Sequence, residues 1–499
     1  MSANLVSTNN DPQGDKNLKA RIFAPENRKW WTLAAVAFGL FMIMLDNTVV
    51  NVALPSIERD LHVSISSLEW IVTAYALTFA ALLITGGKLG DLFGRKRIFI
   101  VGIAIFTLSS LACGLAPSAG FLIGARAVQG VGAALMNPAS LSIITATFPP
   151  RERGQAIGIW AGVSAMALAI GPLVGGLIVD NINWNWIFFI NVPVGIAGVV
   201  VSQLVIKESR DTSHEQSVDI PGLVTSSAGL FALTYALIEG NSHGWSSPEI
   251  LGLFAAAAVL LVTFVLVEHF QRLPMLDLSL FKIGSFTGAN IVAMLVSLGM
   301  FGVFFYVSLY IQNILGFTPT EAGAAFLPMT ILIILVAPLA GKASDRIGSR
   351  WLMGIGMTLV GISLLLYQRV GLASTFWTLL PSMLLGGVGM ALTMAPMTAA
   401  AMSSVPVDKA GVGSGVLNSF RQLGGAIGIA LMGAIVASYV TVSGHTPVAA
   451  QQFVDGLHAA LLVAAIITFA AAAVAIALVR RPAHQPQAAE SASLAELAA

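Results

Sequence analysis

Two ionisable side chains lie inside apolar segments of this chain, where each could carry chemistry. Asp46 occurs in the segment Leu45–Pro55, which also holds Asn51. An acid at the centre of a membrane span costs about 2.5–3.5 kcal/mol on insertion scales, so it should face a water-filled cavity or a partner. Asp46 is either an inert acid that packs helices together or a carboxylate that binds and releases a proton, because burial disfavours its charged form.

Arg126 is the second such residue, within the segment Leu122–Ala134. On a helix, the face that carries Arg126 also carries small and polar residues, namely Gln129, Ala133 and Asn137. This face either lines a cavity or meets an acid, or else Arg126 locks the helices together by bonding to backbone carbonyls. The sequence leaves both interpretations open.

Further polar residues within apolar segments are candidates to line a substrate cavity. Besides Asn51, Gln129 and Asn137, they are Tyr75, Asn418, Arg421 and Gln422. Weaker candidates near the ends of such segments are Glu69, Glu239 and Glu321. The sequence contains no evident nucleophile–base pair and no histidine pair at metal-ligand spacing, so we expect neither an enzyme nor a metal site.

The composition indicates a membrane protein. Charged residues make up 10% of the 499 residues, against about 25% in soluble domains. The hydrophobic fraction is 56% and the mean hydropathy is +0.85. So few charges could not cover the surface of a soluble protein, whereas a chain within a bilayer needs no such cover. The net charge of +1 does not suggest a nucleic-acid partner, and the single cysteine, Cys113, excludes a disulfide within the chain.

Apolar runs long enough to cross a bilayer, about 20 residues each, must position these side chains. We predict fourteen spans, near 30–55, 67–89, 97–116, 119–146, 154–179, 185–206, 219–239, 248–268, 285–311, 320–341, 350–368, 374–402, 411–440 and 455–479. An even number places both termini on the same side of the membrane. Lys and Arg concentrate in the terminal segments and in alternate loops, so the positive-inside rule predicts that both termini are cytoplasmic.

Two charged connections nearly repeat each other, Gly87–Lys96 after the second span and Gly341–Arg350 after the tenth. Repeats of this kind indicate two related halves. Eight spans separate the copies, whereas two adjoining halves of six spans would give six, so two spans have been inserted. The predicted division is a disordered tail at 1–29, a six-helix bundle at 30–206, two added helices at 207–283, a second six-helix bundle at 284–480 and a tail at 481–499.

Several glycines and a proline interrupt the fifth predicted span, at Gly162 and within Gly171–Gly176. Small residues let helices approach closely, and proline bends a span. The segment is therefore either a close helix crossing or a bend that seals or hinges a pathway.

Together these segments resemble the major facilitator superfamily, and within it the fourteen-span drug/proton antiporter branch. The resemblance rests on the charged loop Gly87–Arg97 and its weaker echo Gly341–Arg350, the aspartate segment Leu45–Pro55, the arginine segment Leu122–Ala134, the glycine-proline segment, Trp184–Pro193 and Pro274–Phe281. One position departs from the pattern: relatives often carry arginine where this chain has Asn185.

The resemblance implies an all-α polytopic membrane protein, in which two six-helix bundles rock about a central site and two inserted helices complete fourteen transmembrane helices. It implies that Asp46 and Arg126 couple protons to export. It also implies gating roles for Gly87, Asp91, Gly94, Arg95, Gly171, Pro172, Gly175 and Asp345. The proton gradient would supply the energy without a cofactor. The partners would be a small-molecule substrate, protons and the lipid bilayer, and the protein would act as a monomer in the cytoplasmic membrane.

Three functions compete at this stage. The first is proton-coupled efflux of amphipathic, often cationic compounds, and the second is dedicated export of one endogenous metabolite, antibiotic or lipid-like molecule. The third is a membrane sensor or scaffold that does not transport, which the absence of a signalling domain in the short predicted tails disfavours.

Overall fold

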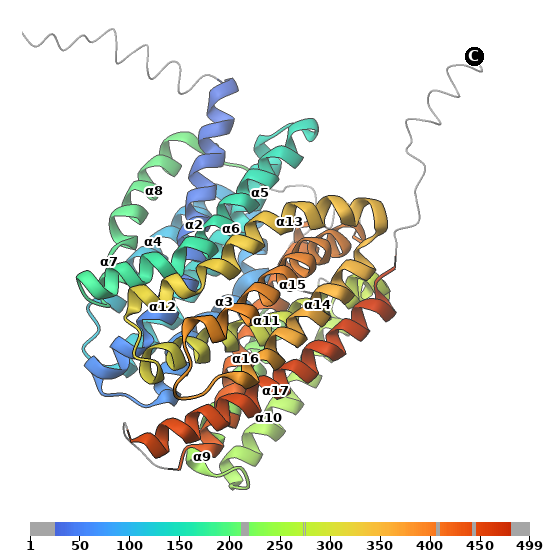
Figure 1. The fold of residues 1–499 in the computed structure, drawn as a ribbon. Helices are drawn as coiled ribbons and strands as arrows, with labels where there is room; N and C mark the ends of the chain where they lie inside the picture. Colours follow the sequence, from blue (N-terminus) through green and yellow to red (C-terminus); the bar gives the residue numbers. More distant parts are fainter. Residues whose placement is uncertain are drawn as a thin grey trace, which may run out of the picture.

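The computed structural model describes residues 25–210, 219–272, 274, 276–405, 410–441 and 446–480, and this part of the chain folds into helices (Figure 1). The first helix begins at Pro25, inside the segment predicted as an N-terminal tail. The rest of that tail, and the C-terminal tail predicted at 481–499, lie outside the described residues. The expectation of an all-α protein is confirmed.

The helices of the first half begin and end close to the predicted spans. They are α2 (Pro25–Leu61), α3 (Ile65–Phe93), α4 (Arg95–Gly114), α5 (Ala119–Thr147), α6 (Pro150–Asn181), the short α7 (Trp186–Phe189) and α8 (Asn191–Val205). The next two helices are α9 (Ile220–His243) and α10 (Pro248–Phe270).

A 3-10 turn, η1 (Leu278–Lys282), leads into the second half. Its helices are α11 (Gly284–Leu309), the π-helical η2 (Tyr310–Ile314), the short α12 (Pro319–Ala325), α13 (Leu327–Ile347), α14 (Ser349–Leu366), the 3-10 turn η3 (Tyr367–Arg369), α15 (Phe376–Ser403), α16 (Ala410–Tyr439) and α17 (Pro447–Leu478).

Thirteen helices in the described part of the chain are long and apolar enough to cross a membrane. The remaining predicted span, 154–179, corresponds to α6, a helix of 32 residues in which several side chains lie outside the described part. Its described apolar segment is Ile170–Asn181. Every predicted span therefore coincides with a helix.

The two repeated loops adopt the same turn. The eighth residue of each copy, Gly94 and Gly348, ends one helix and begins the next, with φ of 109° and 88°. A side chain would be strained at these angles, so both positions favour glycine. Each glycine N–H also bonds to the carbonyl four residues earlier, at Gly90 and Ser344. The turn that repeats in the sequence therefore repeats in the structure.

Glycines set how closely the helices pack within a half. In the second half, a Cβ atom at Gly428 on α16 would stand 2.7 Å from Leu298 Cα on α11. A Cβ atom at Gly424 would stand 2.8 Å from Met294 Cα one turn away. The two backbones are therefore in direct contact along this crossing, as small residues permit in membrane helices.

The two halves meet at α3 against α16, α6 against α12, and α2 against α11. In Figure 1, α12 lies beside α6 at the end of the molecule away from the start of α2 and the end of α17. We call this end the outer end, following the orientation predicted from the charges. Helices α9 and α10 pack on each other, and α9 also contacts both α3 and α16. The division into six, two and six spans stays a prediction.

A larger residue at the α11–α16 crossing should destabilise the fold. We expect Gly428→Val to lower the free energy of unfolding by about 1–3 kcal/mol, because α16 must move away from the backbone of α11. The measurement is the thermal melting of the purified protein in detergent. Gly252→Val is the control, since a Cβ atom at Gly252 on α10 meets nothing within 4 Å. Equal melting temperatures for the two variants would contradict the prediction.

Candidate functional site

Asp46 and Arg126 form a buried ion pair within the first half. The Arg126 guanidinium donates from Nη1 to Asp46 Oδ2 at 2.5 Å, and both residues are 1% exposed. Arg126 Nη1 also donates to Gln129 Oε1 at 2.7 Å, and Gln129 Nε2 donates to Asp46 Oδ1 at 3.0 Å. The predicted polar face of α5 therefore meets an acid on α2.

Arg126 makes further contacts on α3 and α7. Its Nε donates to the carbonyl oxygen of Ile71 at 3.1 Å. Its guanidinium carbon lies 4.3 Å from the centre of the Tyr75 ring and 5.7 Å from that of Phe188. Stacking of this kind is worth about 2 kcal/mol or more when desolvated. Tyr75, predicted as a cavity residue, is therefore a stacking partner of Arg126.

Two site residues were missed by the sequence reasoning. Asn191, at the start of α8, donates from Nδ2 to Asp46 Oδ1 at 3.5 Å and to Ser110 Oγ at 3.0 Å. Ser110 Oγ in turn donates to the carbonyl oxygen of Phe188 at 2.9 Å. The sequence signal for Asn191 is its place within the segment Trp184–Pro193.

We call Asp46, Arg126, Gln129 and Asn191 the acid network. It joins α2, α5 and α8, and through Ile71 it joins α3 as well. A buried charge is stable only when it is paired and hydrogen-bonded. A proton on Asp46 would leave the charge of Arg126 without its partner. The described residues contain no group of three His, Cys, Asp or Glu side chains that could hold a metal ion.

The other predicted cavity residues lie away from the acid network. Asn137 shares the face of Arg126 but follows it by eleven residues, about 16 Å along the helix. On α16, Gln422 is 7% exposed, while Asn418 and Arg421 are half-buried. This part of α16 packs against α3 beyond the network, where Ser419 Oγ donates to the carbonyl oxygen of Ala80.

The outer end is closed by contacts between the halves, centred on α2. Ser308 Oγ donates to the carbonyl oxygen of Asn51 at 3.0 Å, and Gln312 Nε2 donates to that of Val52 at 3.0 Å. Asn51, predicted as a cavity residue, thus contacts the second half through its main-chain carbonyl oxygen. We call these two hydrogen bonds the outer seal.

The glycine-proline segment of α6 completes this closure. A Cβ atom at Gly175 would lie 3.0 Å from Val49 Cα on α2, and Gly171 abuts Thr48 in the same way. On the opposite side of α6, a Cβ atom at Gly176 would lie 2.7 Å from Thr320 Cα on α12. The segment is therefore a close crossing that lets α6 pack on both halves at once. The Thr320 N–H also donates a hydrogen bond to Asp180 Oδ2 across this crossing, at 2.9 Å.

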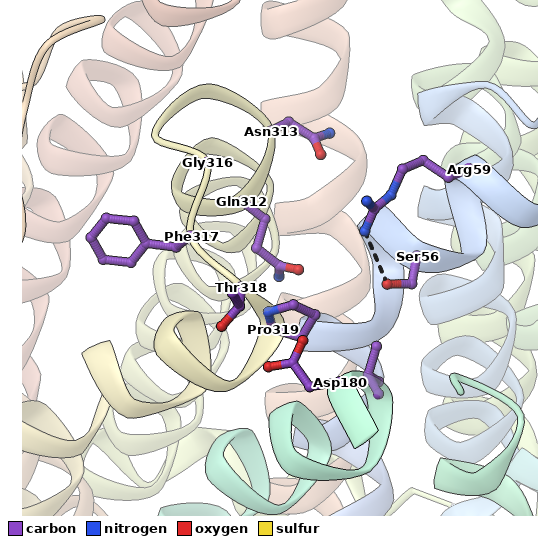
Figure 2. Close-up of a pocket in the computed structure, with 10 residues that line it drawn as sticks. Ser56, Arg59, Asp180, Gln312, Asn313, Gly316, Phe317, Thr318 and Pro319 are labelled. Atoms are coloured by element: carbon purple, nitrogen blue, oxygen red, sulfur yellow. Dashed lines mark hydrogen bonds between the residues drawn. The ribbon is translucent and has the colours of Figure 1, made fainter. Parts of the chain in front are cut away.

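Beyond the outer seal lies a polar pocket of about 560 Å³ (Figure 2). Arg59 and Ser56 from α2 line one side of it, hydrogen-bonded to each other at 3.3 Å. Asp180 from α6 and Gln312 from η2 line the others. Gln312 thus lines this pocket and also takes part in the outer seal.

The predicted gating residues of the first repeated loop make local contacts. Asp91 accepts a hydrogen bond from Arg95 Nε at 2.9 Å, one helical turn away. Gly94 provides the turn between α3 and α4, and Gly87 faces Pro138 on α5. The side chain of Asp345, their counterpart in the second loop, lies outside the described residues.

The three weaker acidic candidates, Glu69, Glu239 and Glu321, make different contacts. Glu321 forms a capping box with Thr318 at the start of α12, so its role there is to begin a helix. Glu239 accepts hydrogen bonds from Ser66 and Trp70 and ties α9 to α3. Glu69 lies between the halves.

Comparison with known proteins supports the resemblance. A family model described as Major Facilitator Superfamily matches residues 36–302 and again 289–498. The Tetracenomycin C resistance and export protein of Streptomyces glaucescens is 36% identical over 441 residues, which is 87% of this chain and 80% of that protein. The Multidrug resistance protein Stp of Mycobacterium tuberculosis is 36% identical over 413 residues, 82% of this chain and 76% of that protein.

A solved structure shows the same fold. It is a bacterial homologue of the human lysosomal transporter Spinster, with a TM-score of 0.63, 18% identity, and coverage of 91% of this chain and 99% of that chain.

Removing one partner of the buried ion pair should cost more than removing both. We expect Arg126→Met to lower the free energy of unfolding by about 3–5 kcal/mol, because Asp46 would stay buried and uncompensated. The double variant with Asp46→Asn should recover much of this loss. Thermal melting in detergent measures both.

Arg95→Met is the control for this pair of variants. It removes the partner of Asp91, and the two side chains are 19% and 29% exposed. Because surface ion pairs contribute about 0–1 kcal/mol, its effect should be small. A double variant no more stable than Arg126→Met would contradict the prediction.

Proposed function

Because the chain belongs to the Major Facilitator Superfamily, we propose that it is a proton-coupled antiporter that exports amphipathic, often cationic compounds. The observation that carries this proposal is Asp46, an acid 1% exposed inside a membrane bundle and bound to Arg126. Intramembrane acids of this kind are expensive and mark proton relays. The names of the two relatives, one a resistance and export protein and one a multidrug resistance protein, support export from the cell.

A proton on Asp46 would rearrange the acid network. The neutral carboxyl group would no longer compensate Arg126, which would keep the Ile71 carbonyl and the Tyr75 ring. The tie between α2 and α5 would weaken, while the tie between α5 and α3 would persist. Proton binding would therefore change how α2 sits against the rest of its half.

The same stretch of α2 reaches the outer seal. The carbonyl groups of Asn51 and Val52 follow Asp46 by five and six residues, about 8–9 Å along the helix. A shift of α2 would displace both acceptors from α11 and η2. We therefore propose that the protonation state of Asp46 is coupled to the outer seal: Asp46 binds a proton from the outside while the outer end is open and releases it to the inside after that end has closed.

Cargo is proposed to contact apolar side chains of the second half. A small cavity of about 30 Å³ lies among α11, α13, α14 and α15, and methionines from three of these helices line it, namely Met300, Met329 and Met390. Methionine side chains adapt to irregular shapes, so this region could rearrange to accept unrelated apolar groups.

Dedicated export of one compound is the second candidate. It is supported by the name of the Streptomyces glaucescens relative, which specifies one antibiotic. Transport assays with unrelated compounds separate the two: mutual competition supports multidrug export, and a single responsive compound supports the dedicated exporter.

The setting of the protein is part of the proposal. We propose that it lies in the cytoplasmic membrane with both termini in the cytoplasm, acts as a monomer, and uses the proton gradient without a cofactor. A membrane potential of 100 mV supplies about 2.3 kcal/mol for each charge that crosses. The two halves would alternate in exposing the central site, with the repeated loops acting as gates.

Asp46→Asn should fold and insert but lose proton-driven export. The neutral side chain keeps the size of aspartate and one acceptor oxygen, but it cannot bind and release a proton. The measurement is proton efflux from proteoliposomes on addition of cationic, neutral and anionic test compounds, together with uptake of the compounds under an imposed pH gradient.

Asp455→Asn is the matched control, since Asp455 is an exposed acid near the start of α17. It should transport at the wild-type rate. Proton-driven transport by Asp46→Asn at that same rate would show that Asp46 does not carry the coupled proton.

A further inference from the structure

A second acid lies buried between the two halves of the molecule. Glu69 on α3 is 2% exposed, and its Oε1 accepts a hydrogen bond from the Tyr306 hydroxyl on α11 at 2.6 Å. Its other oxygen, Oε2, has no hydrogen-bond partner among the described residues. This contact lies on the outer side of the acid network along α3, since Glu69 precedes Ile71 and Tyr75 on a helix that begins at the outer end.

Among the described residues around Glu69, we find no positive charge that is free to pair with it. Helix α9 presents another acid, Glu239, which accepts from Ser66 and Trp70 on either side of Glu69. Helix α5 reaches α3 through Arg126, which is already paired with Asp46. Helix α16 presents Gly433, and none of the residues 423–438 is ionisable.

Helix α16 packs directly against Glu69. A Cβ atom at Gly433 would lie 2.5 Å from the Glu69 carboxyl carbon, so α16 touches the acid directly. An ionised carboxylate in such a place, with one hydrogen bond and no cation, is costly, and a group in that position takes up a proton instead.

We propose that Glu69 is a second proton-binding site, and that its proton holds the two halves together at the outer end. The inference rests on the proposed alternating-access function, because Glu69 and Tyr306 belong to different halves and would separate when the outer end opens. A neutral Glu69 is compatible with the closed contact, whereas an ionised Glu69 favours exposure to water. Glu69 would therefore bind its proton on closing and lose it on opening to an alkaline exterior.

A distance measurement across the outer end tests this proposal. Spin labels at cysteines replacing Asn183 and Ala373, both exposed in outer loops of opposite halves, report the opening, with Cys113→Ser removing the native thiol. The protein that retains Glu69 and the Glu69→Gln variant both also carry Asp46→Asn, so Asp46 does not contribute to the pH response of the distance. With Glu69 present, the distance should lengthen as the pH is raised, and with Glu69→Gln it should stay short at every pH.

Glu239→Gln is the matched control, because it removes a neighbouring acid that lies outside the contact with α11. It should keep the pH response. A response that survives in Glu69→Gln overturns the proposal, and so does a Glu69-containing protein whose distance is the same at every pH. This second outcome is measured on the protein that retains Glu69, so it does not depend on whether the Glu69→Gln variant folds.

Infrared spectroscopy tests the proton directly. The C=O stretching band of protonated carboxyl groups at neutral pH should lose one component in Glu69→Gln, and an unchanged band would overturn the proposal. Neither measurement depends on transport. The failure of Glu69 as a proton site is therefore distinguishable from failure of Asp46 in the flux assay.

Discussion

The need to compensate a charge buried in apolar surroundings governs the first half of this molecule. Asp46 and Arg126 come from α2 and α5, and each is costly there without the other. Gln129 and Asn191 also donate hydrogen bonds to the carboxylate, and the carbonyl oxygen of Ile71 accepts a hydrogen bond from the guanidinium. Four helices are thereby fixed relative to one another by one pair of charges.

Helix α2 connects this constraint to the rest of the fold. Within two turns it presents Asp46 to α5, Thr48 and Val49 to the glycines of α6, and the carbonyls of Asn51 and Val52 to the second half. Ion pairing, close helix packing and the contact between halves therefore depend on the same short segment. A change in one of them must be accommodated by the other two.

The sequence was sufficient to predict the helices and the two central charges. Long apolar runs have no other stable arrangement in a bilayer, and an acid or arginine within such a run is rare enough to stand out. Asn191 was missed because asparagine near a span end carries no such signal. The outer seal was missed because Ser308 and Gln312 bond to carbonyl groups, which every residue has. The predicted tail extended to residue 29, yet α2 begins at Pro25, because the polar residues there continue the helix beyond its apolar part.

The use of main-chain acceptors in the outer seal has an evolutionary consequence. A substitution at position 51 or 52 changes a side chain but leaves the carbonyl oxygen that α11 and η2 require. The residues around the central site can therefore diversify while the closure between the halves is inherited unchanged. Selection on what is carried and selection on how the protein closes would then act on largely separate sets of atoms.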